Sequence, residues 1–501
     1  MSDGVYQTQA NVHEDAGPSP ALRTKVASGV RWGLVVSILT QVGRVAFMLA
    51  LMRLLGPRNF GIVGQAAVFI AIAQIFVHFG LAASIVQRPT LDHQEVGTAF
   101  WLNVAMGLIL AAAMVLAAPL LASFFETHEL AAVFRVLALS LVLKAMAIVP
   151  TALLTRNMRF AGIATAEITS TFTSGLIGVG AAAIGAGYWA LVIQAVSLEA
   201  LYLLMIVHLN GLPELTWSTR TARRLWSFSS RIVGADLVNY ASGNFDKILI
   251  AKFLGATALG LYSLAFRVLQ LTLGVMGQVG RVILPTFSRL QNDRERLTRT
   301  FLTVTESVSL AVFPTMTLTI LIAPAGVPAV LGHAWAEAIV PVQLVAALTI
   351  PCVLVSYMGP LTVALGRADC EFYWSVVTLI AMLVAIPIGL LWGIIGVAGS
   401  FLIMLCALTA IRLAVVQRLI PITARGYLRA LAPASACSVV LAIVWELTDA
   451  LLKSMAGELT IAAAASAAGA AAYLITLRVA WPDDYRRQLE FARLILRGDR
   501  R

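Results

Sequence analysis

Apolar runs of twenty or more residues recur almost from one end of this chain to the other. Each run is long enough to cross about 30 Å of hydrocarbon as a helix, and the runs are continuous rather than alternating, which excludes a β-barrel. They account for a composition that is 59% hydrophobic and 12% charged. A soluble protein carries about twice that fraction of charge. The sequence therefore predicts an all-α polytopic membrane protein.

Glycine, proline and charged clusters divide these runs into about fourteen transmembrane helices. The expected spans are 28–55, 59–86, 95–122, 131–154, 160–184, 188–209, 227–254, 257–284, 301–323, 336–359, 361–389, 392–416, 427–449 and 457–480.

The distribution of lysine and arginine predicts the orientation. With a cytoplasmic N-terminus, most of the 36 basic residues fall on the inner side, and the outer loops hold only Arg53, Arg58, Lys252 and Lys453. This bias predicts a multi-pass membrane protein with both termini in the cytoplasm. The net charge of +11 then requires no nucleic acid, because the basic inner rim meets anionic lipid headgroups.

A short motif occurs twice in the chain. The segment "LMRLLGPRNFGIVGQ" begins at Leu51 and "IAKFLGATALGLYSL" begins at Ile250, and both contain a basic residue, any residue, Leu-Gly, four residues and Gly. The two Leu-Gly turns, at Gly56 and Gly255, follow the first and the seventh expected span. An even number of spans between them gives both copies the same orientation, which indicates a parallel repeat about an axis along the membrane normal.

The repeat predicts two six-helix lobes followed by two extra C-terminal helices. The expected parts are a disordered cytoplasmic tail (1–25), an N-terminal lobe (26–209), a cytoplasmic linker (210–226), a C-terminal lobe (227–416), two additional transmembrane helices (417–480) and a basic amphipathic cytoplasmic tail (481–501). Duplicated bundles of this kind usually enclose a cavity where the lobes meet and open it on alternate sides. The alternative is that the duplication records evolutionary growth only.

Basic residues lie inside several apolar spans. Arg44, Lys144 and Arg267 are close to the centres of their spans, where each costs about 2.5–3.5 kcal/mol if it faces lipid. We therefore expect them to face a watery cavity that holds a phosphate or pyrophosphate group, because ammonium and guanidinium groups replace lost water. Arg31 and Lys247 complete the predicted substrate-binding set.

Carboxylates inside the spans suggest ion coupling. The candidates for carrying a proton or a sodium ion are Glu167, Glu199, Asp236 and Asp246. Internal ion pairs, such as Lys144 with Glu167 or Arg267 with Glu199, are the alternative explanation. The four cysteines have no metal-ligand spacing, so we expect no metal site. We also expect no cofactor, other than coupling to an H⁺ or Na⁺ gradient, and no catalytic residue.

Five segments together carry a family resemblance: "NFDKILIAKFLGATALGLYSLAFRV" (244–268), "LTRNMRFAGIA" (154–164), "GAGYWALV" (185–192), "LLGPRNFGIVG" (54–64) and "FGLAASIVQR" (79–88). With these segments the chain resembles the polysaccharide transporter family, the Wzx-type lipid-linked oligosaccharide flippases of the multidrug/oligosaccharidyl-lipid/polysaccharide (MOP) exporter superfamily. The resemblance implies a two-lobed, twelve-helix core in the bacterial plasma (inner) membrane. It also implies a substrate that is a sugar chain on polyprenyl pyrophosphate.

The expected function is therefore an alternating-access flippase. It would move a polyprenyl-pyrophosphate-linked oligosaccharide from the inner to the outer leaflet for exopolysaccharide, lipopolysaccharide or other cell-envelope polysaccharide synthesis, with a polysaccharide polymerase and glycosyltransferases as further partners. One alternative is a cation-coupled drug exporter of the same fold. Two alternatives from another class are a non-transporting membrane scaffold and a membrane-embedded glycan polymerase.

Overall fold

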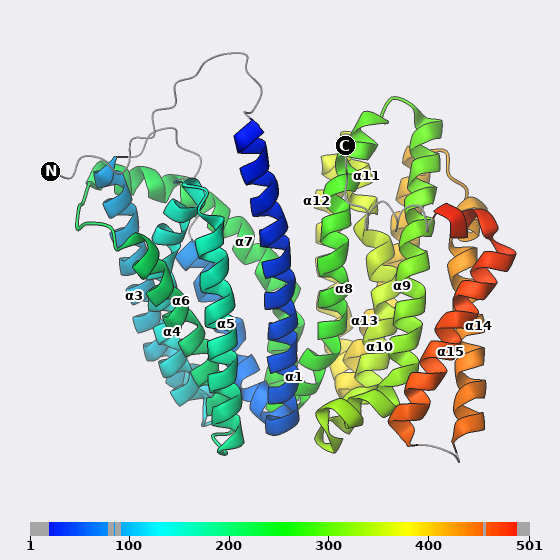
Figure 1. The fold of residues 1–501 in the computed structure, drawn as a ribbon, viewed down its shortest axis with the longest axis horizontal. Helices are drawn as coiled ribbons and strands as arrows, with labels where there is room; N and C mark the ends of the chain where they lie inside the picture. Colours follow the sequence, from blue (N-terminus) through cyan, green and yellow to red (C-terminus); the bar gives the residue numbers. More distant parts are fainter. Residues whose placement is uncertain (1–19, 79–84, 86–91, 454–456, 488–501) are drawn as a thin grey trace. The chain divides into compact units, whose positions relative to one another are not determined.

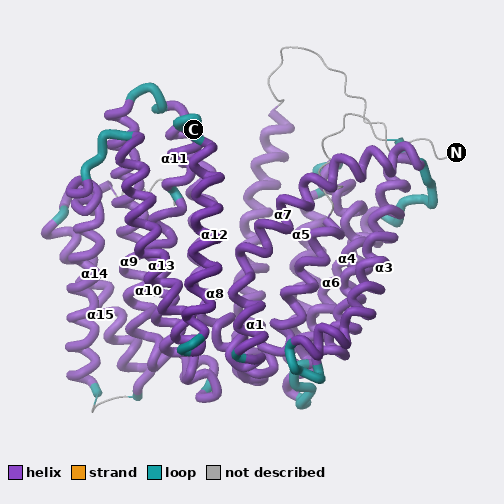
Figure 2. The backbone as a smooth tube through the Cα atoms, turned by 180° about the vertical axis from the view of Figure 1, so that it is seen from behind, coloured by secondary structure: helices purple, strands orange, loops and turns teal. Residues whose placement is uncertain are grey.

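The computed structural model describes residues 20–78, 85, 92–453 and 457–487; for 20–38, 78 and part of 224–282, only the backbone is described. All regular elements in these ranges are helices, joined by short loops (Figure 2). The predicted all-α class is therefore confirmed. The tail predictions for 1–19 and 488–501 lie outside the described residues. The helix that begins at Pro20 starts before the predicted boundary at residue 26.

The described chain forms two compact units, residues 1–259 and residues 260–501. The helices of the first unit are α1 (Pro20–His78), α3 (His93–Phe124), α4 (Leu130–Arg156), α5 (Phe160–Ala183), α6 (Trp189–Asn210) and α7 (Thr219–Phe253). In this unit α3 packs on α4, α5 packs on α6, and α1 contacts both α4 and α5 (Figure 1). On α1, Phe47 meets Phe172 of α5 edge to face at 5.6 Å.

Helix α8 (Gly255–Arg289) begins in the first unit and continues into the second. The other helices of the second unit are α9 (Arg294–Leu331), a 3₁₀ helix η1 (His333–Ala338), α10 (Ile339–Ser356), α11 (Met358–Ala364), α12 (Ala368–Leu390), α13 (Gly393–Leu419), α14 (Ala424–Leu452) and α15 (Glu458–Ala480). Its core contains Phe287, Phe301 and Tyr357. The two C-terminal helices pack on α9, where the Tyr473 hydroxyl donates to the Leu310 carbonyl at 2.8 Å.

Both Leu-Gly motifs form the same kind of turn. Gly56 interrupts α1 with φ 71° and ψ 172°, and Gly255 has φ 82° between α7 and α8. A positive φ is costly for a residue with a Cβ, and glycine adopts it freely. The repeated glycine is therefore explained by a repeated backbone conformation, and α1 consists of two helices that meet at Gly56.

The helices agree closely with the fourteen expected spans, since α1 supplies the first two. Eleven helices among the described residues are long and apolar enough to cross a membrane. Two details differ from the expectation. Residues 358–364 form the separate helix α11, so the eleventh span begins at α12 rather than at residue 361. The repeat predicts that α7 is the first helix of the C-terminal lobe. In the structure α7 packs on α1 and α3 within the first unit. The lobe boundary between residues 209 and 227 stays a prediction.

Candidate functional site

A charged pair lies inside the first unit. Lys144 of α4 places its Nζ 3.6 Å from Glu199 Oε1 of α6 and donates to Gln74 Oε1 of α1 at 3.2 Å. The two charged side chains are only 25% and 18% exposed. These three polar side chains come from three largely apolar helices, and the packing of α1, α4 and α6 brings them into contact. Lys144 is thus compensated by a carboxylate that lies within the same bundle.

Further polar groups surround this pair. The hydroxyls of Thr151 on α4 and Tyr202 on α6 lie 3.3 Å apart, and both Glu167 and Glu199 act electrostatically on Tyr202. Glu167 is half-buried on α5. Two candidate coupling carboxylates, Glu167 and Glu199, therefore lie in the same region of the first unit. The ion pair that forms is Lys144–Glu199, not the Lys144–Glu167 pair considered from the sequence.

Arg44 and Arg267 have a different environment. Arg44 on α1 and Arg267 on α8 are both exposed, although each lies within an apolar membrane-spanning segment. Arg267 donates to Gln270 Oε1 at 3.2 Å, one turn further along the same helix. Neither guanidinium has a carboxylate partner among the described residues. Their predicted convergence with Lys144 depends on how the two units are arranged and stays a prediction.

The remaining predicted site residues lie on α1 and α7. Lys247 is half-buried and donates to Asn244 Oδ1 at 2.7 Å, and Asp246 beside it is buried with 3% exposure. The side chains of Arg31 and Asp236 lie outside the described residues. Within the described chain, no group of three or more His, Cys, Asp or Glu side chains could hold a metal ion.

The second unit contains a buried charged cluster that sequence reasoning missed. Arg412 of α13 is 2% exposed, pairs with Glu371 of α12 and stacks on the Trp374 ring with Cζ 4.6 Å from the ring centroid. Glu371 also accepts from the Thr362 hydroxyl of α11. Arg412 is one of the basic residues that the charge bias predicts on the inner side, where the headgroups were expected as partners, and its side chain is instead buried. A pattern of charge along the sequence gives the depth of a residue but not the direction in which its side chain points.

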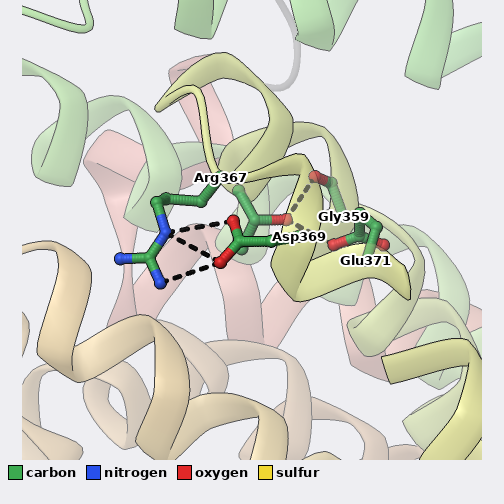
Figure 3. Close-up of polar contacts among 5 residues, drawn as sticks. Gly359, Arg367, Asp369 and Glu371 are labelled. Carbon is green, nitrogen blue, oxygen red and sulfur yellow. Dashed lines mark hydrogen bonds and ion pairs between the residues drawn. The ribbon is translucent and has the colours of Figure 1, made fainter. Parts of the chain in front are cut away.

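The turn that leads into this cluster carries a second, exposed pair. Arg367 donates to both carboxylate oxygens of Asp369, from Nε at 3.1 Å and from Nη2 at 3.1 Å. Figure 3 shows this pair next to Glu371 and Gly359. The segment "RADCEF" (367–372) thus contains one solvated acid and one that pairs with a buried arginine.

Another cluster connects the segment after α15 to α9. Arg487 lies 3.5 Å from Glu306 of α9 and also pairs with Asp484, while the Glu306 and Asp484 side chains are 15% and 12% exposed. Arg487 belongs to the predicted basic tail (481–501), and the sequence does not show these acidic partners. The Arg487–Glu306 pair holds the segment that follows Ala480 against the second unit.

Comparison with known proteins identifies the family. The chain matches the family described as polysaccharide biosynthesis protein over residues 50–340, more than half of its length. The chain belongs to that family. The match confirms the resemblance to a polysaccharide-related family, and the long apolar helices make the chain a multi-pass membrane protein.

Individual relatives show how far the similarity extends. The chain is 26% identical over 392 residues to the lipopolysaccharide biosynthesis protein WzxC of Escherichia coli (strain K12), covering 76% of this chain and 79% of the relative. It is 26% identical over 411 residues to the succinoglycan biosynthesis transport protein ExoT of Rhizobium meliloti (strain 1021), covering 79% and 80%. The solved structure of the lipid II flippase MurJ, in an inward closed conformation, has a TM-score of 0.67 at 15% identity, covering 90% of this chain and 99% of MurJ. That comparison shows a shared fold.

Proposed function

We propose that the protein is a flippase of the bacterial plasma membrane, with both termini cytoplasmic, and not an enzyme. It moves a polyprenyl-pyrophosphate-linked oligosaccharide from the inner to the outer leaflet for exopolysaccharide or other cell-envelope polysaccharide synthesis. The family membership supports a role in polysaccharide biosynthesis, and the similarity to a succinoglycan biosynthesis transport protein supports transport. The observation that carries the substrate class is the exposure of Arg44 and Arg267 within apolar helices, without a carboxylate partner among the described residues.

The surroundings of these two arginines determine the free-energy cost of placing their charges inside the membrane. A guanidinium that faces lipid near the bilayer centre costs about 2.5–3.5 kcal/mol, so two of them would cost about 5–7 kcal/mol, which is comparable to the stability of a domain. Water or an anion in front of them removes that cost. Lys144 differs, because Glu199 already compensates much of its charge. Arg44 and Arg267 are therefore the cations that remain available for a ligand.

A pyrophosphate group suits these side chains. Arginine presents a planar fork of donors that binds phosphate oxygens in a bidentate manner, and it keeps its charge at every physiological pH. A lipid-linked sugar carries this anionic group between an apolar tail and a polar glycan, and the pyrophosphate is the part for which the hydrocarbon core is least favourable. Arg44 and Arg267 would bind it during the crossing. Lys144, Arg31 and Lys247 stay secondary candidates.

Glu199 is our candidate for ion coupling, with Glu167 beside it. When Glu199 takes up a proton or a sodium ion, Lys144 loses its compensating charge, and the cation becomes available to the substrate anion. Asp246 and Asp236 are alternative sites of coupling.

Reconstitution tests the proposal. The purified protein is placed in vesicles with a fluorescent polyprenyl-pyrophosphate oligosaccharide, and exchange between leaflets is followed by a membrane-impermeant quencher. We expect exchange by the wild type and at least a tenfold loss in Arg44→Ala and Arg267→Ala, because each loses a charge-assisted contact worth about 1.5–3 kcal/mol. Arg135→Ala is the matched control, since Arg135 is also exposed but lies in the first turns of α4.

The same vesicles separate the alternatives. Undiminished exchange in both arginine variants would contradict an anion-binding role for Arg44 and Arg267. Transport of a cationic dye in preference to the lipid-linked sugar would favour a drug exporter. No exchange by the wild type, even with partner glycosyltransferases and polymerase present, would favour a scaffold, whereas lengthening of the glycan would favour a polymerase.

A further inference from the structure

The loop between α3 and α4 binds both copies of the repeated Leu-Gly motif. Glu126 accepts from Lys252 Nζ at 2.8 Å, next to the turn at Gly255. Glu129 accepts from Arg58 Nη2 at 2.8 Å, next to the turn at Gly56. Lys252 Nζ also lies 5.2 Å from the centroid of the Phe124 ring. A single acidic loop therefore connects two segments that are far apart in the sequence but equivalent in the repeat.

The two repeated motifs also touch each other. A Cβ placed on Gly61 would lie 1.7 Å from the carbonyl oxygen of Ala256, so only glycine allows this approach. Nearby, Gln65 Nε2 donates to the Ala251 carbonyl at 3.4 Å. The pairs Glu126–Lys252 and Glu129–Arg58, together with the Gly61–Ala256 contact, form what we call the rim clasp. All of its residues belong to the first unit.

The charges of the rim clasp are complementary but only weakly shielded from water. The Lys252 hydrogen bond and charge lower the pKa of the Glu126 carboxyl. The pKa of Glu129 is also lowered, first by a hydrogen bond from its own backbone and then by Arg58. Glu126 is 79% exposed and Arg58 is 64% exposed, and exposed ion pairs of this kind contribute little each. The two ion pairs of the rim clasp are thus formed at neutral pH, and each adds only a small free energy to the closed arrangement.

We propose that the rim clasp holds one state of the transport cycle and that Glu126 and Lys252 are its positioning residues. This inference rests on the proposed transport function. Under the repeat, Lys252 and Ala256 belong to the second lobe, while Glu126 and Gly61 belong to the first. If the two lobes of the repeat separate on this side, which the charge distribution predicts to be the outer side, these contacts must break. Release of the rim clasp would accompany release of the substrate.

A reversible metal bridge tests this role. The variant Glu126→His/Lys252→His replaces the two partners of the 2.8 Å ion pair by imidazoles, which can share one Zn²⁺ when the clasp is closed, with water as the remaining ligands. Leaflet exchange is measured with and without Zn²⁺ and after addition of EDTA. We expect Zn²⁺ to slow exchange at least tenfold, because it binds only the closed clasp and shifts the population toward it, and EDTA to restore the rate. The two single histidine variants and the wild type are the controls.

Three results of this experiment would contradict the proposed role of the rim clasp or the transport function on which it rests. Zn²⁺ that binds the double variant tightly without slowing exchange would show that transport does not require the rim clasp to open. Zn²⁺ that binds the double variant no better than the single variants would show that the rim clasp does not form. Absence of leaflet exchange in the wild type would instead contradict the proposed transport function, and with it this role. The Zn²⁺ affinity of the double variant would still show whether the Glu126–Lys252 contact forms.

Discussion

Loss of the Glu371 charge should strongly destabilise the second unit. Arg412 is 2% exposed, and its Nε is buried without a hydrogen-bond partner among the described residues, so Glu371 is the group that compensates its charge. Removal of one partner of a buried pair costs about 3–5 kcal/mol. Because the Glu371 side chain is 32% exposed, water can reach the arginine after the change, and we place Glu371→Gln near the lower limit, at about 3 kcal/mol.

Substitution of the other partner, Arg412, should cost less stability. Arg412→Met removes the buried charge and fills much of the same volume with an apolar chain, which leaves a carboxylate that water can partly solvate. We expect a loss of about 1 kcal/mol, and a similar loss for the double variant Glu371→Gln/Arg412→Met. The non-additivity should therefore be about 2–3 kcal/mol, within the range of residues that interact directly.

A double-mutant cycle measures this coupling. The free energy of unfolding is obtained in bicelles by steric trapping, and melting temperatures give a second measure, since 1 kcal/mol shifts a unit of this size by about 2–4 °C. The neighbouring exposed pair provides the matched control, because Asp369→Asn removes a charge that water already solvates and should leave the stability almost unchanged. Additive losses in the cycle, or equal losses for Glu371→Gln and Asp369→Asn, would refute the reasoning.

Two further predictions concern the rim clasp. Gly61→Ala should destabilise the protein by about 1–3 kcal/mol in thermal melts, because its Cβ would overlap the Ala256 carbonyl oxygen, and backbone atoms cannot easily yield. Gly64→Ala, whose nearest neighbour is the flexible end of a leucine side chain at 3.3 Å, should be nearly neutral, and equal losses in both variants would contradict the steric argument. The Glu126 pKa is lowered in the folded protein, so its pair with Lys252 stabilises the fold above the ordinary carboxyl pKa and loses this effect as the pH falls through the folded value. Wild type and Glu126→Gln should therefore differ in melting temperature at pH 7 and converge as the pH falls below the lowered pKa of Glu126; a difference that stays constant throughout an acid titration would contradict this assignment.

The sequence predicted the helices and the repeated turn for physical reasons that act locally. A span is a property of consecutive apolar residues, and a positive φ requires glycine at the turn itself, so Gly56 and Gly255 could be recognised from the motif alone. The separate helix α11 was missed because 358–364 has the same apolar character as the segments around it. Hydropathy cannot divide one continuous run at a change of backbone direction.

The partners of the charged residues could not be predicted in this way. Lys144 pairs with Glu199 rather than Glu167 because α4 and α6 turn these faces toward each other, and the rotation of a helix about its axis depends on packing with its neighbours. The same reasoning applies to Arg412, whose position in the chain places it near the inner side but whose side chain is directed into the bundle. For the rim clasp, the repeat identified the motif that contains Lys252, but the sequence does not show that Glu126 and Glu129 of the α3–α4 loop lie against the two motifs.

The central claim is that Arg44 and Arg267 face water inside the membrane and bind the anionic group of the substrate. The most direct measurement is the rate at which Arg44→Cys and Arg267→Cys, made in a background without the four native cysteines, react with a membrane-impermeant thiol reagent in vesicles. Leu116→Cys on α3 is the reference for a side chain that faces lipid, since Leu116 is 76% exposed on an apolar helix. We predict that both test cysteines react much faster than the reference and that the lipid-linked oligosaccharide protects them. Reaction as slow as that of Leu116→Cys at both positions would contradict the account.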